Sequence, residues 1–185
     1  MKRLLLINPW IYDFTAFDLW SKPLGLLYLA SFLRQFDYEI DFIDCLCDTK
    51  NGKDSKKNRY GTGHYTRTII EKPEVLKDVP RHYARYGISE EKFISQIHSF
   101  GEIDAILITS FMTYWYPAVK RVVEIVREQI PGKAVILGGV YASILPDHAR
   151  RVVNPDFIIK GPGEIESLRL LDSLFSSKKS SGILP

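Results

Sequence analysis

Four short segments of this sequence carry residues suited to holding a ligand, and each follows an apolar run. They are residues 8–12, 110–113, 138–141 and 161–164. Glycine and small or aromatic residues predominate in them. Glycine lets a ligand approach the backbone closely, and helix N-termini favour anionic groups. Acid–base groups are few there, namely Glu164 and the nearby Asp13, with no histidine. This composition suits gripping a flat, partly apolar ligand better than acid–base chemistry on a substrate.

Each segment also has a purely structural interpretation. Ser110 could cap a following helix, a role that serine often fills. Gly138-Gly139 could form a tight turn, Trp10 and Tyr12 could be ordinary core residues, and residues 161–164 could be a plain connection. Because all four segments follow predicted strands, their combination favours a binding site over these separate explanations.

The elements that position these segments alternate along the chain. Apolar runs predict strands over residues 4–8, 39–43, 105–109, 134–137 and 156–160. Helical patterns cover residues 24–35, 118–129, 146–153 and 164–175, with proline or glycine beside each. This alternation predicts an α/β fold with helices on both faces of a parallel sheet. We expect a flavodoxin-like (Rossmann-like) sheet of five strands in the order 2-1-3-4-5, which binds ligands at the carboxyl ends of its strands.

Three common motifs of such folds are absent. Residues 8–13, after the first predicted strand, contain no glycine, so the G-x-G-x-x-G fingerprint of dinucleotide binding is missing. The sequence also has no G-x-x-x-x-G-K-[ST] phosphate loop. A phosphoacceptor domain would need an aspartate at the end of the third strand, where Thr109-Ser110 stands instead.

Length and composition indicate one domain. The chain has 185 residues, 45% hydrophobic residues and a net charge of +3. Two cysteines are too few for a disulfide scaffold, or for this chain to hold a four-iron cluster alone. Apolar runs are too short for a signal-peptide core or a membrane span, which predicts a cytoplasmic protein with no membrane partner. We expect Cys45 and Cys47 to be reduced thiols without a metal.

Three blocks of the sequence resemble one known family, and together they extend over nearly the whole chain. The first is Asn8-Pro9 with residues 23–30, the second is Gly138-Gly139 with Pro146, and the third is residues 156–164. They resemble the N-terminal cobalamin (B12)-binding domain of B12-dependent radical S-adenosylmethionine (SAM) enzymes. Residues 110–112, followed by Gly138-Gly139, also match the S-x-L…G-G signature of B12 folds, with methionine in place of leucine.

The resemblance implies a cobalamin site at the four segments. It implies that Ser110 contacts the base of the nucleotide tail and that the glycines make room for the tail. The residues predicted to bind the cofactor are Asn8, Trp10, Ile11, Tyr12, Leu24, Gly25, Ser110, Phe111, Met112, Thr113, Gly138, Gly139, Val140, Tyr141, Gly161, Gly163 and Glu164. No catalytic residue and no metal ligand is assigned.

One motif of many B12 mutases and methyltransferases is missing. Those proteins carry D-x-H-x-x-G after the first strand, and its histidine coordinates cobalt. Residues 13–18 have neither the histidine nor the glycine, and radical SAM members often lack them. We therefore expect base-off cobalamin with no protein histidine on the cobalt. Trp10, Ile11 or Tyr12 would lie near the lower face of the corrin.

The resemblance also implies a domain organisation. Residues 1–175 would form the cobalamin-binding domain, and residues 176–185 the start of a linker to a radical SAM domain. That domain would hold SAM and a [4Fe-4S] cluster through a C-x-x-x-C-x-x-C motif, which this sequence lacks. The chain alone would bind cofactor without turnover, and its parent would be a methyltransferase or a related enzyme. The alternative is a flavodoxin-like module that binds a partner or small ligand and no corrin.

Residues 48–92 form a long basic and aromatic insert after the second predicted strand. The insert carries 11 Lys and Arg residues against 7 Asp and Glu residues, a net charge of +4. Its aromatic residues predict order over at least residues 60–87, since disordered segments are poor in aromatics. Three roles are possible for the insert: a solvated surface loop, a cap over the corrin, or a docking surface for the radical SAM domain. The docking surface would consist of residues 59–65 and 81–86. The interspersed acidic residues make nucleic-acid binding unlikely.

Overall fold

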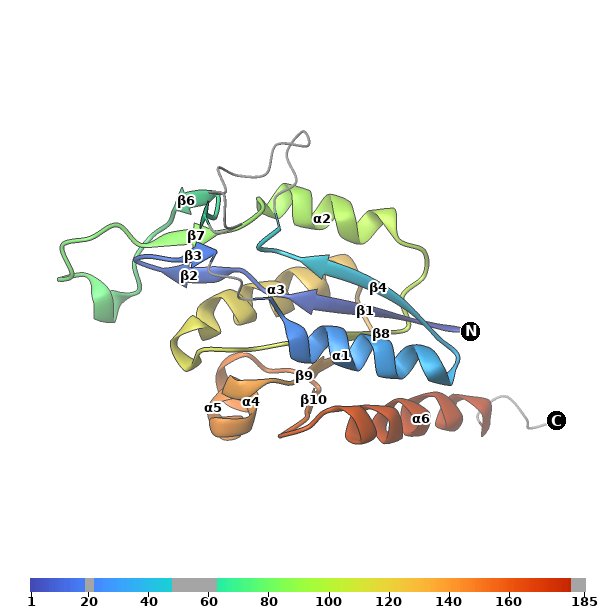
Figure 1. Ribbon diagram of the computed structural model, residues 1–185. Helices are drawn as coiled ribbons and strands as arrows, with labels where there is room; N and C mark the ends of the chain where they lie inside the picture. Colours follow the sequence, from blue (N-terminus) through green and yellow to red (C-terminus); the bar gives the residue numbers. More distant parts are fainter. Residues whose placement is uncertain (19–21, 48–62, 181–185) are drawn as a thin grey trace.

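A parallel sheet of five strands forms the centre of the molecule (Figure 1). The computed structural model describes residues 1–18, 22–47 and 63–180. The order of the strands is β4-β1-β8-β9-β10, which confirms the predicted order 2-1-3-4-5 and the flavodoxin-like α/β fold. The strands are β1 (Lys2–Asn8), β4 (Tyr38–Asp44), β8 (Ala105–Ile108), β9 (Ala134–Leu137) and β10 (Phe157–Ile158).

Helices cover both faces of this sheet, as the side chains of β1 require. Strand side chains alternate between faces, so Leu4 and Leu6 pack on one side while Leu5 and Ile7 pack on the other. All four are fully buried, which explains the continuous apolar run. One face is covered by α1 (Leu24–Leu33) and α6 (Glu164–Ser180), and the other by α2 (Glu90–Ser99), α3 (Tyr116–Gln129) and α5 (Pro146–Val152).

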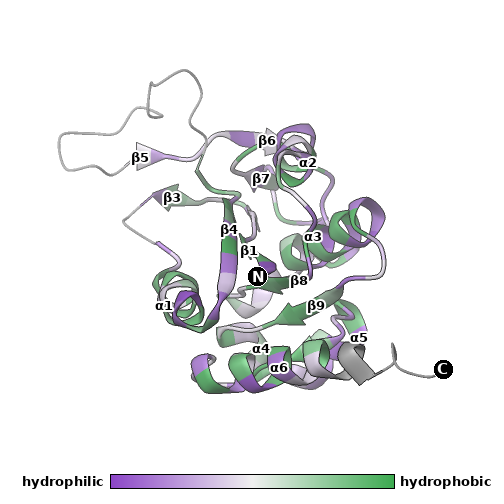
Figure 2. Cartoon of the chain, turned by 90° about the vertical axis from the view of Figure 1, so that its right-hand side faces the viewer, coloured by the Kyte–Doolittle hydropathy of each residue, from purple (hydrophilic) through white to green (hydrophobic). Residues whose placement is uncertain are grey.

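The long helix α3 shows the amphipathic pattern that the sequence predicts. Val119, Val122, Val123 and Val126 are buried against the sheet. In Figure 2 the strands β8 and β9 are green, and hydrophilic purple appears on the helices around them. Burial of each such valine removes a side chain worth about 1.5–3 kcal/mol from water, so this face is a major source of stability.

A second, smaller sheet was not predicted. It consists of β2 (Ile11–Asp13), β7 (Ala84–Tyr86) and β6 (Arg67–Ile69), all antiparallel. Beside it β3 (Phe17–Asp18) pairs with β5 (Gly63–His64). The insert thus adds strands to the segment that follows β1. Residues 48–62 lie outside the described residues, and they include residues 60–62, the first part of the stretch predicted to be ordered.

Several predicted boundaries are corrected. The helix predicted to reach residue 35 ends at Leu33, and a 3₁₀ turn, η1 (Arg34–Phe36), leads to Asp37 in the left-handed region at φ 65°. Residues predicted as a loop after β9 form α4 (Val140–Ile144). The last helix, predicted to end at residue 175, continues to Ser180 as α6. Two further 3₁₀ turns are η3 (Glu74–Leu76) and η4 (Thr113–Trp115). Within the described part of the chain, no helix combines the length and the apolar character needed to cross a bilayer.

Candidate functional site

The segments that follow β1, β8, β9 and β10 meet at the carboxyl edge of the sheet, as expected for parallel strands (Figure 1). The two larger hollows at this edge lie side by side. The first, the rim groove, has a volume of about 380 Å³. Its lining consists of Asn8, Ile11, Lys22, Pro23, Leu24, Gly25, Leu26, Leu46, Thr109, Ser110, Phe111, Trp115, Gly139 and Val140.

The second hollow, the inner pocket, lies between α1, α6 and the ends of β8 and β9. Its volume is about 190 Å³, and glycines form much of its wall. Gly25 and Gly139 line both hollows, which places the inner pocket directly beside the rim groove. The lining of the inner pocket is Gly25, Leu26, Leu29, Leu107, Ile108, Thr109, Ile136, Gly138, Gly139, Ile159, Gly161, Pro162, Gly163, Glu164 and Ser167.

The two adjacent glycines at the end of β9 have different roles. Gly139 has a φ of 93°, and a Cβ atom there would lie 2.2 Å from the carbonyl oxygen of Ser110. Gly139 is therefore required by the close approach of the backbone itself. At Gly138 the nearest atom to an added Cβ is the Ile159 carbonyl oxygen at 3.9 Å. A Cβ atom at Gly138, a residue that lines the inner pocket, would therefore meet only an ordinary van der Waals contact.

Ser110 is held within the protein by two hydrogen bonds. Its hydroxyl donates to the Gly138 carbonyl oxygen at 2.6 Å and accepts from the Ala142 amide at 3.2 Å. The residue is 3% exposed. The hydroxyl has a single proton, and that proton is already used between β8 and β9.

Most of the residues predicted to bind the cofactor line one of the two hollows. Five do not, and they fall into two groups. Met112 and Thr113 lie at the start of η4, on the outer side of the edge. The aromatic residues Trp10, Tyr12 and Tyr141 are directed into the protein interior.

Tyr141 is fully buried on α4, where burial raises its pKa to about 12. Its hydroxyl forms a hydrogen bond of 2.8 Å with Nδ1 of His148. Tyr116 stacks on the Tyr141 ring and meets the His148 ring edge-on. The cluster therefore joins α3, α4 and α5, and its rings pack against one another.

Trp10 belongs to the core below the small sheet. Its indole nitrogen donates to the Ile88 carbonyl oxygen at 2.8 Å, and its ring packs edge-on against Phe93. Arg85 lies over the same ring at 5.5 Å. Tyr12 is half-buried, and burial raises the pKa of its hydroxyl to about 12, so this group is neutral at physiological pH. Of the three residues predicted near the corrin's lower face, Ile11 alone lines the rim groove.

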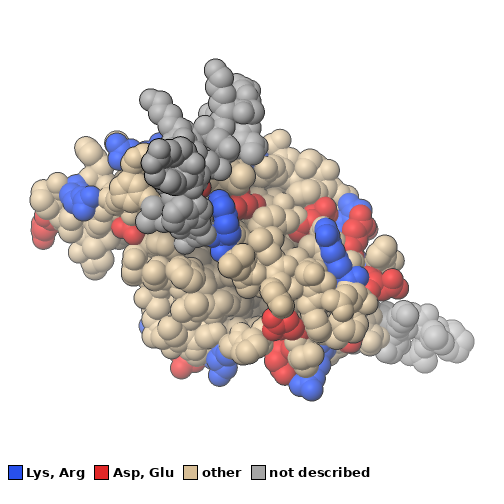
Figure 3. Space-filling view, in the orientation of Figure 1, with Lys and Arg blue, Asp and Glu red and all other residues tan. Residues whose placement is uncertain are grey.

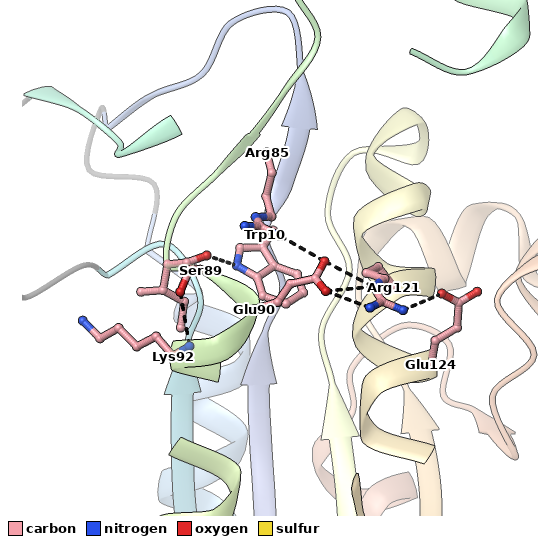
Figure 4. Close-up of polar contacts among 8 residues, drawn as sticks. Trp10, Arg85, Ser89, Glu90, Lys92, Arg121 and Glu124 are labelled. Carbon is pink, nitrogen blue, oxygen red and sulfur yellow. Dashed lines mark hydrogen bonds and ion pairs between the residues drawn. The ribbon is translucent and has the colours of Figure 1, made fainter. Parts of the chain in front are cut away.

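An ion-pair network holds the small sheet against the two neighbouring helices (Figure 4). Glu90, the first residue of α2, accepts a hydrogen bond from Arg85 of β7 at 2.9 Å and another from Arg121 of α3 at 2.7 Å. Hydrogen bonding from Arg121 lowers the pKa of Glu90, so the carboxylate stays ionised. Because Ile11 of β2 pairs with Tyr86 of β7, the network also fixes this wall of the rim groove.

Several residues of the rim groove were not predicted from the sequence. Trp115 lies in η4, and its indole nitrogen donates to Asp13 at 2.9 Å. Lys22 lies just before α1, and its ammonium group is 3.5 Å from the buried carboxylate of Asp18. Leu46 follows β4. Proximity in sequence to predicted site residues was a usable signal for Lys22 and Trp115, whereas Leu46 follows a strand for which no site was predicted.

The predicted docking residues 81–86 are largely turned inward. Tyr83, Ala84 and Tyr86 are buried, and Arg85 is paired with Glu90. Arg81 donates a hydrogen bond to the Thr15 hydroxyl at 2.6 Å. His82 is exposed, and the described part of the structure shows no contact for its side chain. Residues 59–62 of the other predicted docking stretch lie outside the described residues.

Among the described residues, no histidine lines either hollow, and no group of three His, Cys, Asp or Glu side chains is placed to hold a metal ion. The arrangement is thus a glycine-lined pocket beside a larger, mostly apolar groove. Such a site can bind a ligand that has a broad, flat part for the groove and a smaller group for the pocket.

No family model matches the chain. The chain is 23% identical over 175 residues to cytidylyl-2-hydroxyethylphosphonate methyltransferase from Streptomyces wedmorensis. The match covers 94% of this chain and 28% of that protein.

Two solved structures share the fold. The radical SAM methyltransferase TsrM from Kitasatospora setae, with tryptophan substrate and a SAM analogue bound, matches with a TM-score of 0.62 and 13% identity. The match covers 96% of this chain and 26% of TsrM. TsrM with cobalamin and a [4Fe-4S] cluster bound gives a TM-score of 0.59.

The chain is similar to the N-terminal region of B12-dependent radical SAM methyltransferases. This similarity confirms the family resemblance seen in the sequence. The chain spans only about a quarter of the length of these relatives.

Proposed function

We propose that this chain binds cobalamin, as the cofactor-binding region of a B12-dependent radical SAM methyltransferase. The observation that carries the proposal is the glycine-lined inner pocket beside the rim groove, at the edge where this fold binds ligands. An apolar cavity of about 150 Å³ can hold benzene, so a pocket of about 190 Å³ can admit a bicyclic aromatic base.

The residues fall into two sets for this ligand. Gly25, Gly138, Gly163 and the edge of α6 would surround the nucleotide tail in the inner pocket. Ile11, Phe111, Val140 and Trp115 would support the corrin in the rim groove, where apolar side chains predominate. When bound, cobalamin supplies a cobalt centre that can carry a methyl group. The described residues bind and orient this cofactor and exclude water from its tail.

We also propose that cobalamin binds base-off, without a histidine on the cobalt. Two features support this. A tail held in the inner pocket removes its base from the cobalt, and the described lining of both hollows contains no histidine. Imidazole is the side chain that most often coordinates metals, so its absence from the lining leaves no usual candidate for the lower position.

The remaining parts of the function belong to protein outside this chain. The relatives are about four times as long as the region that matches. We propose that a following radical SAM domain holds SAM and the [4Fe-4S] cluster. The chain by itself would then bind the cofactor without catalysing a reaction. We propose that it does so in the cytoplasm.

Retention of a corrin tests the proposal. The purified chain is incubated with hydroxocobalamin and desalted, and its visible spectrum is recorded. We expect corrin absorbance near one equivalent. Gly138→Val, which adds an isopropyl group at the wall of the inner pocket, should retain less than about a tenth of it. Ser31→Val, which places the same side chain on the exposed side of α1, is the control and should retain the corrin.

Two results would count against the proposal. Complete loss of corrin from the folded wild-type chain would contradict cobalamin binding. Electron paramagnetic resonance of the reduced cobalt tests the ligand separately: nitrogen superhyperfine splitting would contradict the base-off state without histidine.

A further inference from the structure

The hydroxyl of Ser167 has no partner inside the protein. Ser167 lies on the second turn of α6 and is 1% exposed, and its Oγ forms no hydrogen bond with any described group. A buried hydroxyl left unpaired costs free energy, so such groups are rare and call for an explanation. The side chain lines the inner pocket, which gives this hydroxyl one direction in which a partner can arrive.

A glycine of the inner pocket, Gly163, lies beside the hydroxyl of Ser167. An added Cβ at Gly163 would lie 3.8 Å from the Ser167 Oγ and 3.8 Å from a methyl group of Ile159. The Ser167 Oγ is itself buried, and Gly163, which also lines the inner pocket, places no side chain beside it. Thr109 lines the same pocket but is partly exposed, so water can satisfy its hydroxyl.

Ser110, the residue that the family signature assigns to the base, has no proton to offer. Its hydroxyl donates to Gly138 and accepts from Ala142. A base displaced from cobalt exposes a ring nitrogen with a free lone pair, and this acceptor needs a donor. Of the two buried serines at this edge of the sheet, Ser110 lines the rim groove and Ser167 lines the inner pocket, and Ser167 is the one whose proton is free.

We propose that Ser167, rather than Ser110, donates the hydrogen bond to the aromatic base of the cobalamin tail. This inference rests on the proposed function, since it requires the tail in the inner pocket. Ser167 is thus a binding residue that distinguishes corrinoids with a nitrogen-containing base from those without one. The chain should therefore lose affinity for tailed corrinoids when the hydroxyl is removed or covered.

Dissociation constants for two ligands test the inference. Hydroxocobalamin carries the nucleotide tail, and cobinamide lacks it. Ser167→Ala should raise the dissociation constant for hydroxocobalamin about 3- to 10-fold, the range expected for one hydrogen bond between neutral groups, and leave that for cobinamide unchanged. Gly163→Ala, whose methyl group covers the hydroxyl at van der Waals distance, should have the same effect. Ser31→Ala removes an exposed hydroxyl from α1 and should change neither constant.

Stability provides an independent readout. Removing an unpaired buried hydroxyl should not lower the melting temperature of the ligand-free chain, so weaker binding by Ser167→Ala cannot be attributed to misfolding. Equal affinities of wild type and Ser167→Ala for hydroxocobalamin, or equal losses for both ligands, would overturn the role of Ser167. Failure of the folded wild-type chain to bind either ligand would instead overturn the proposed function.

Discussion

At the scale of single residues, the contacts of Ser110 and Gly139 join the ends of β8 and β9. The Val140 amide donates to the Ser110 carbonyl oxygen at 2.8 Å, and the Ser110 hydroxyl donates to Gly138. Gly139 has no room for a side chain against the same serine. The serine and the second glycine of the B12-type signature therefore have a structural role that needs no ligand. The first glycine is the one that borders open space.

This difference between adjacent glycines can be measured. Gly139→Ala should lower the free energy of unfolding by about 2–4 kcal/mol, because the new Cβ would combine a backbone clash with a left-handed φ of 93°. Gly138→Ala, the neighbouring control, should lower it by less than about 1 kcal/mol because the nearest atom to its Cβ lies at an ordinary van der Waals distance of 3.9 Å. Urea unfolding monitored by circular dichroism gives both values. Equal losses would contradict the assignment of separate roles.

At the scale of elements, Glu90 connects three of them. It is the first residue of α2 and pairs with Arg85 of β7 and Arg121 of α3, beside Trp10 (Figure 4). Ser89 caps the same helix by accepting a hydrogen bond from the Lys92 amide at 3.2 Å. The small sheet is therefore attached to the main fold by charge as well as by its apolar contacts, and the attachment depends on the ionised state of one carboxylate.

Acid should loosen this attachment. The pKa of Glu90 is lowered from its ordinary 4.5 in the folded state, chiefly by the hydrogen bond from Arg121. Its contribution is therefore complete above that ordinary value and is lost as the pH falls through the folded-state pKa. Glu90→Gln should cost about 1–2 kcal/mol of unfolding free energy near pH 7, because a charge-assisted pair is removed in a half-exposed setting.

The pH dependence of the stability loss in Glu90→Gln tests whether the ionised carboxylate is its cause. The difference between wild type and Glu90→Gln in urea unfolding should shrink as the pH is lowered from about 7 to about 3. Glu124→Gln breaks a more exposed contact to the same Arg121, at 3.5 Å, and should cost less than about 0.5 kcal/mol throughout. A difference for Glu90→Gln that does not vary with pH would rule out its ionised state as the cause.

The elements also show how far sequence patterns reach. β1 and β8 were predicted because each is a continuous apolar run buried on both faces. The small sheet was not, because a strand of three residues has no measurable period. The pairing of Ile11 with Tyr86 also joins positions far apart in the chain. Likewise Ser167 could not be singled out, since its lack of a partner depends on how α6 packs.

At the scale of the whole molecule, α1 differs in surface character from α2 and α3 on the other face of the sheet. The helices α2 and α3 carry charged residues outward, whereas α1 contains no charged residue. In Figure 3 the surface where Figure 1 draws α1 is largely tan, that is, free of Lys, Arg, Asp and Glu. Leu24 and Tyr28 on this helix are 70% and 73% exposed. The stability of this side therefore rests on the contacts of α1 and α6 with the sheet.

The packing of α6 is the part of this arrangement most open to test. Leu171 is fully buried in one cluster with Leu26 and Leu33 of α1. The Tyr38 hydroxyl also donates to Asp172 at 3.1 Å, which ties α6 to β4. Leu171→Ala should lower the free energy of unfolding by about 2–4 kcal/mol, the usual cost of a cavity at a fully buried leucine.

An exposed position on the same helix supplies the control. Ile165 is 52% exposed, so Ile165→Ala should cost less than about 1 kcal/mol in the same urea titration. Because α6 also forms a wall of the inner pocket, hydroxocobalamin should raise the unfolding midpoint of both variants, by binding the folded state alone. Equal losses at the two positions would show that α6 does not close this side of the core. The inner pocket, and with it the place proposed for the nucleotide tail, would then lose its structural basis.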